Sequence, residues 1–202
     1  MPLILGLVLG AVPADRVSRR VGPKVTVAVG FAVLAAALLI GARTTVDSSA
    51  WFVAAWMAGV GMGMGIALST AAAGALAELP EERSGVGAAV MQACQKLGGP
   101  FGAAILGSAL ASVYRAQVSV GALPAPAMAA VRGSVFSGLA VAQRLHSPEL
   151  LASVRAAFVD GMDVALLVSA GFAAAGLVCA LIFLPGRVAV PAAAEERVVA
   201  GI

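Results

Sequence analysis

Long apolar runs alternate with short charged segments along most of the chain. Three runs, 25–42, 50–77 and 164–184, contain no charged residue, and a fourth, 86–113, contains only Lys96. A helix needs about 20 mostly apolar residues to cross the hydrocarbon core of a bilayer. The pattern therefore predicts four full transmembrane helices over these four ranges.

The first residues form an apolar run that is shorter than the others. Residues 1–12, MPLILGLVLGAV, lack the basic start of a signal peptide and are too few to span a bilayer. We expect a truncated transmembrane helix here, the second half of one that begins upstream, in a fragment or a reading frame with a late start. Residues 13–24 hold Asp15 and four cations and are predicted to be a basic loop; the cations are Arg16, Arg19, Arg20 and Lys24.

A long connection, 114–163, separates the last two apolar runs. Apolar residues from Met128 to Leu139 fall near helical spacing, and Ser147 precedes Pro148 and Glu149 in the order expected at a helix start. We expect amphipathic helices that lie on the membrane surface or against the bundle. A further short spanning segment is the other interpretation.

Composition supports a membrane protein. The 202 residues are 61% hydrophobic and only 11% charged, and the mean hydropathy is +1.01. Soluble domains usually carry about 25% charged residues, so these charges could not cover a water-facing surface. The fold class predicted is all-α, a polytopic helix bundle in the lipid bilayer.

The charge excess is small and local. The net charge is +3, and no basic stripe is interleaved with aromatic residues, so nucleic acid is not expected as a partner. Cations concentrate in 13–24, and lysine and arginine in short loops favour the cytoplasmic side. This places 13–24, the turn 78–85 and the tail 185–202 in the cytoplasm, and the connection 114–163 outside the cell membrane.

The sequence offers little for catalysis or metal binding. Its two cysteines, Cys94 and Cys179, lie within apolar runs and are expected to be buried free thiols, and His146 is the only histidine. These residues give neither a disulfide framework nor zinc spacing. No nucleophile–base pair or phosphate loop is present. We therefore expect no enzyme activity, no metal site and no cofactor.

Glycines repeat at four-residue spacing inside two of the runs. Gly59 and Gly63 share one helical face and Gly61 and Gly65 another, since small residues so spaced let helix backbones approach closely. The fourth run contains a similar set, Gly98, Gly99 and Gly102. Helix packing is the first interpretation, and a contact that slides or rocks during transport is a second, compatible one.

Polar residues also lie within or beside the apolar runs. Gln92, Gln95 and Lys96 lie on one face of the predicted fourth helix. Lys96 either extends to the near interface or faces an aqueous cavity. Asp160 and Asp163 precede the last run as interfacial acids, or, at Asp163 above all, as a proton or cation site.

The basic segment resembles a motif of the major facilitator superfamily. ADRVSRR followed by VGPK is similar to that family's G-x-x-x-D-R-x-G-R-R loop, with matches at Asp15, Arg16, Arg19 and Arg20 and with Ala11 and Ser18 at the glycine positions. The resemblance implies that these four residues form a conformational gating loop.

A second stretch, 59–108, resembles the fourteen-helix drug:proton antiporters of the EmrB/QacA type. Their pattern is a glycine-rich helix, a P-x-E-R-x-G turn and N-x-x-R-Q-L-G-G-x-x-G, and Gln92, Gln95 and Lys96 stand at its Asn, Arg and Gln positions. The resemblance implies the C-terminal portion of such a protein, a partial C-terminal half. Its implied function is export of hydrophobic or cationic compounds against proton influx, by alternating access.

A stand-alone membrane scaffold that does not transport is the alternative. Such a protein would assemble through its small-residue faces. A continuous reading frame upstream of Met1 that encodes more helices would favour the transporter, and a clear start at Met1 would favour the scaffold.

Overall fold

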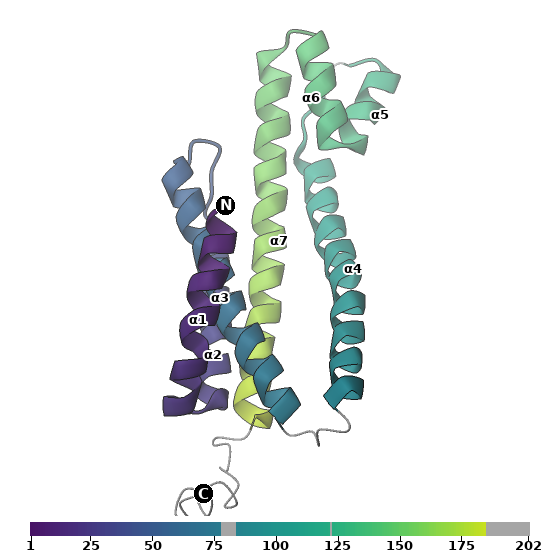
Figure 1. The fold of residues 1–202 in the computed structure, drawn as a ribbon. Helices are drawn as coiled ribbons and strands as arrows, with labels where there is room; N and C mark the ends of the chain where they lie inside the picture. The colour runs from purple at the N-terminus through teal and green to yellow at the C-terminus, as the bar shows by residue number, and fades with distance from the viewer. Residues whose placement is uncertain (78–83, 122, 185–202) are drawn as a thin grey trace, which may run out of the picture.

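The computed structural model describes residues 1–77, 84–121 and 123–184. Within these ranges every regular element is an α-helix, which confirms the all-α prediction (Figure 1). The seven helices are α1 (Pro2–Val21), α2 (Pro23–Gly41), α3 (Ala50–Ala77), α4 (Ser84–Gln117), α5 (Ala125–Gly133), α6 (Val135–Arg144) and α7 (Pro148–Phe183). The predicted turn 78–85 lies mostly outside the described residues, and the tail 185–202 lies wholly outside them.

Four helices are long and apolar enough to cross a membrane. They are α2, α3, α4 and α7, and the four ranges predicted from the sequence fall on them. The length and composition of these helices support a membrane protein. Along the described chain, α1 and α2 meet at Gly22 at the lower end of Figure 1, and α5 and α6 lie at the upper end. We call these the Gly22 end and the α5–α6 end.

The charged segment 13–24 is helical up to Val21, so the predicted loop is wrong over most of its length. The loop was predicted because charged residues are unfavourable in lipid. Charge does not prevent a helix, however, since alanine and arginine are good helix formers and valine is tolerated. The connection to α2 is the single residue Gly22, with φ 91° and ψ 154°, a backbone conformation that only glycine adopts readily. Pro23 then opens α2, where its missing N–H costs nothing.

The predicted boundary between connection and last span also changes. The chain has one continuous helix from Pro148 to Phe183 in place of a separate span at 164–184. Ser147 caps it, because its Oγ accepts a hydrogen bond from the Leu150 N–H at 3.3 Å. The remaining connection contains α5 and α6, which at 9 and 10 residues are too short to span a membrane.

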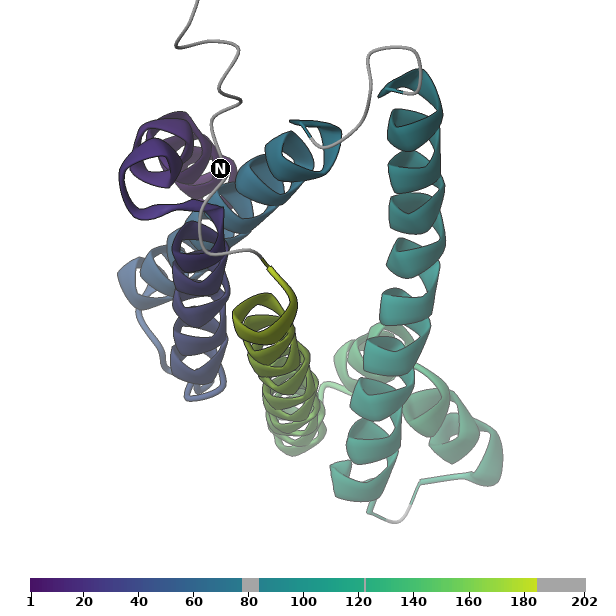
Figure 2. The same ribbon diagram turned by 90° about the horizontal axis from the view of Figure 1, so that it is seen from below.

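The helices form two groups on either side of α7. Helices α1 and α2 both pack along α3, and α7 packs on α2 through a cluster that includes Leu38, Ala170 and Ala173. Seen from below, α4 stands apart from α1–α3 with α7 between them (Figure 2). Helix α4 packs mainly on α7, and α5 and α6 close the far end of that pair.

Candidate functional site

The four residues of the basic motif lie on the last two turns of α1. The Arg19 Nη2 donates a hydrogen bond to the Asp15 Oδ2 at 2.9 Å, one turn apart, and both side chains are mostly exposed. A solvated pair of this kind contributes a few tenths of a kcal/mol. Arg16 and Arg20 are exposed and form no ion pair with another described residue. The motif is therefore a charged helix end, with its turn at Gly22.

The glycines of α3 lie against two different helices. A Cβ built at Gly63 would come within 2.6 Å of the Leu34 backbone nitrogen in α2, and one at Gly59 within 2.9 Å of the Ala37 Cβ. At Gly61 and Gly65 a Cβ would overlap the backbone of α1. The two faces expected from the spacing thus contact α2 and α1 respectively.

Helix α1 carries a matching stripe of small residues that was not predicted from the sequence. Gly6, Gly10 and Ala14 are its buried residues, spaced four apart. A Cβ at Gly6 or Gly10 would overlap the backbone of α3 at Ala58 or Met62. The same small-residue spacing that singled out α3 would have found this stripe.

The glycines of α4 behave differently. Nothing lies within 4 Å of a Cβ built at Gly98, Gly99 or Gly102, so the described chain does not use them for helix packing. Gly98 and Gly102 instead line an apolar hollow of about 530 Å³ between α2, α4 and α7, together with Phe31, Phe101 and Phe172 among others. These glycines have no close neighbour among the described residues because α4 stands away from α1–α3.

The polar residues Gln92, Gln95 and Lys96 are exposed on α4. No hydrogen bond or ion pair joins them to another described residue, and none of them lines the hollow between α2, α4 and α7. The structure therefore does not bring them together with Asp163 or with the basic motif.

Asp163 lies where the charged part of α7 meets its uncharged part. Its Oδ1 is buried and has no hydrogen-bond partner among the described residues. The same is true of the Trp56 Nε1 in α3. Val60 and Leu166 pack on the same apolar cluster. Trp56 precedes Val60 by about one turn of α3, and Asp163 precedes Leu166 by about one turn of α7. Both polar residues therefore lie on the side of this cluster that is nearer the α5–α6 end. Asp160, by contrast, is exposed.

The α5–α6 end has its own buried core. Val131 and Val154 are fully buried there, and the Tyr114 hydroxyl donates a 2.8 Å hydrogen bond to the Val131 carbonyl oxygen. Gly138 makes room for that hydroxyl, since a Cβ there would come within 2.7 Å of it. This core fixes α5 and α6 on the ends of α4 and α7. The sequence analysis did not anticipate it.

The cysteines are exposed, not buried as expected. Both lie on helices long enough to span a membrane, where an outward side chain would face lipid. Among the described residues no three His, Cys, Asp or Glu side chains group closely enough to hold a metal ion.

Comparison with known proteins assigns no family. No family model matches the chain, and none of the curated proteins matches it.

Proposed function

We propose that the chain forms the C-terminal part of a secondary active transporter of the cell membrane, a proton-coupled exporter of hydrophobic or cationic small molecules. The motif resemblances to the major facilitator superfamily motivate this proposal. The observation that carries it is the buried carboxylate oxygen of Asp163, which lies on a membrane-length helix and has no hydrogen-bond partner among the described residues. Ionisable groups in such helices are costly and usually mark an ion or substrate path.

The surroundings of Asp163 suit a group that gains and loses a proton. The carboxylate makes no ion pair with a described residue that would hold it permanently charged. A carboxylate that is not held in an ion pair can take up and release a proton more readily than one that is paired.

The packing of α1, α2 and α3 also supports the proposal. Close backbone contacts through glycine make these three helices a compact unit, and transporters of this kind rock such units around a central site. The exposed face of α4 would then meet lipid or the N-terminal helices that the proposal requires. The C-terminus is expected in the cytoplasm.

Reconstituted transport tests the proposal. The full gene product would be placed in proteoliposomes, and uptake of a hydrophobic cationic dye would be followed with and without an imposed pH gradient. We expect gradient-driven transport that Asp163→Asn removes, while Asp160→Asn, an exposed neighbour on the same helix, retains it. Absence of gradient-driven transport for every compound tested would contradict the proposal.

The scaffold alternative makes a different prediction. A scaffold would assemble through its small-residue faces without moving any solute, and Asp163→Asn would leave its assembly unchanged. Reading the frame upstream of Met1 separates the two hypotheses at once.

A further inference from the structure

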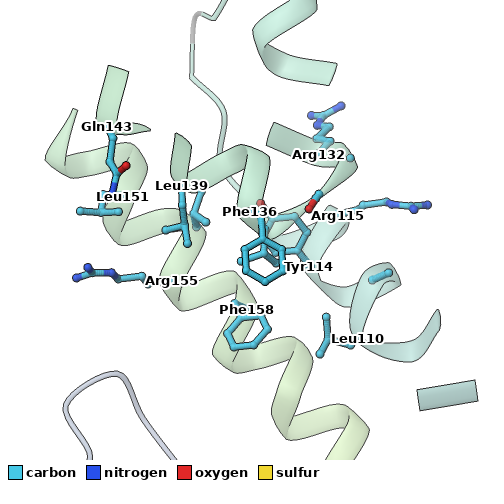
Figure 3. A pocket seen from close by; sticks show the side chains of 15 residues that line it. Leu110, Tyr114, Arg115, Arg132, Phe136, Leu139, Gln143, Leu151, Arg155 and Phe158 are labelled. Atoms are coloured by element: carbon cyan, nitrogen blue, oxygen red, sulfur yellow. The ribbon is translucent and has the colours of Figure 1, made fainter. Parts of the chain in front are cut away.

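A cavity of about 540 Å³ lies at the α5–α6 end, between the ends of α4 and α7 and the two short helices (Figure 3). Its wall is mostly apolar and includes Leu110, Leu139, Leu151, Phe136 and Phe158. Volumes of this size hold small-molecule or lipid-chain ligands. Phe136 is 84% exposed and lies at the mouth, so the cavity opens to its surroundings.

Among the described residues, three arginines from three different helices line this cavity and no acidic residue does. They are Arg115 at the end of α4, Arg132 at the end of α5 and Arg155 in α7. None forms an ion pair with a described residue. Figure 3 shows Arg115 and Arg132 on one side of the aromatic centre and Arg155 on the other, with their guanidinium groups directed outward from it. The cavity thus combines an apolar interior with a positively charged rim.

If α4 crosses a membrane, the end of its uncharged stretch sets the level where hydrocarbon changes to headgroups. Arg115 directly follows the uncharged stretch 97–114 of α4. Arg155 precedes the uncharged stretch 164–183 of α7 by nine residues, about 13 Å along the helix. Gly161 packs on Leu110, so the two arginines lie at similar heights. Long arginine side chains reach headgroups from such positions.

We propose that this cavity binds an anionic phospholipid, with an acyl chain against Phe136 and Phe158 and the phosphate near Arg115 and Arg132. Guanidinium groups suit phosphate because they offer several donors and a permanent charge. The apolar wall favours a lipid over a free inorganic ion as the occupant, since only the lipid has an acyl chain that can cover this wall. The site is independent of whether the protein transports.

Lipid retention by the purified chain tests this site. The chain in detergent would be offered phosphatidylglycerol or phosphatidylcholine with the same acyl chains, and bound lipid would be counted by native mass spectrometry. We expect phosphatidylglycerol to be retained about tenfold more strongly. The double variant Arg115→Gln, Arg132→Gln should reduce this preference to none.

A matched control separates lipid binding from helix stability. Arg144 also lies in the last turn of a short helix at this end but does not line the cavity. Arg144→Gln should therefore keep the preference. Phe136→Glu adds a carboxylate at the exposed mouth without removing a buried contact, and should weaken phosphatidylglycerol binding in a folded protein.

Three outcomes would overturn the proposal. One is equal retention of the two lipids by the wild-type chain. Another is loss of the preference in Arg144→Gln to the same extent as in the double variant. The third is displacement of bound phosphatidylglycerol by millimolar inorganic phosphate, which would identify a free-anion site.

Discussion

At the scale of single residues, Tyr114 makes the best-defined contact of the α5–α6 end. Its ring is buried in the core there, and its hydroxyl reaches the backbone of α5 across a stretch of 17 residues. Gly138 in α6 leaves the space that this hydroxyl occupies. One side chain of α4 therefore ties both short helices in place.

Replacing Tyr114 with phenylalanine should loosen α5 and α6. The Val131 carbonyl would be buried without a partner, which costs about 1–3 kcal/mol. Hydrogen–deuterium exchange of residues 125–144 should become about tenfold faster or more, because local opening governs exchange. In the control Ser112→Ala, the lost hydrogen bond stays within α4, so exchange there should not change. Equal exchange in Tyr114→Phe and wild type would contradict this role.

The core around Tyr114 could not be derived from the sequence. The helical spacing from Met128 to Leu139 indicated the short helices, and the order Ser147, Pro148, Glu149 indicated the cap. The partner of Tyr114 depends on how α5 folds back over α4, which no local pattern specifies. The same holds for the three arginines of the cavity, which are far apart in the chain and meet only through the packing of α4, α5 and α7.

At the scale of helices, the spacing of the glycines predicted which of them share a helical face, but not which helix that face contacts. Gly59, Gly61, Gly63 and Gly65 divide between two faces of α3 because the helical repeat alone decides this. Gly98 and Gly102 have the same spacing, yet they face open space. Whether such a face meets a neighbour depends on the position and rotation of α4, which are set by the rest of the bundle.

The contrast between these glycines gives a direct stability test. Alanine in place of glycine favours a helix by about 1 kcal/mol at either site. At Gly61 the new Cβ would also overlap the backbone of α1, and overpacking costs about 1–3 kcal/mol. Gly61→Ala should therefore lower the thermal stability of the purified chain, and Gly98→Ala should preserve or raise it. Equal shifts in the melting temperatures of both variants would be inconsistent with the packing described.

The basic segment shows a second limit of pattern reasoning. Its charges predicted a segment unsuited to lipid, but they did not distinguish a loop from an exposed helix end. The decisive residue is Gly22, where the positive φ allows α1 and α2 to connect through one residue.

At the scale of the whole molecule, the arginines at the end of α1 are expected to govern orientation. Neutralising both Arg19 and Arg20 removes half of the cations in 13–24 and the partner of Asp15. We expect altered topology or slower conformational switching, with the relative rates for different substrates unchanged. Arg19→Lys with Arg20→Lys keeps the charge and should preserve topology. Topology can be followed by the accessibility of a terminal epitope tag from each side of the membrane. If the neutralised variant kept both its transport rate and this accessibility, the role would be refuted.

The central claim is that the chain crosses a membrane four times, with the Gly22 end in the cytoplasm and the α5–α6 end outside. Single cysteines can be placed at Ser18, Asp47 and Phe136 in a chain whose Cys94 and Cys179 are replaced by serine. The probe is a membrane-impermeant maleimide applied to intact and permeabilised cells. Cysteines at Asp47 and Phe136 should react in intact cells, and the one at Ser18 only after permeabilisation. Labelling of Ser18→Cys from outside, or of Phe136→Cys only after permeabilisation, would contradict the account.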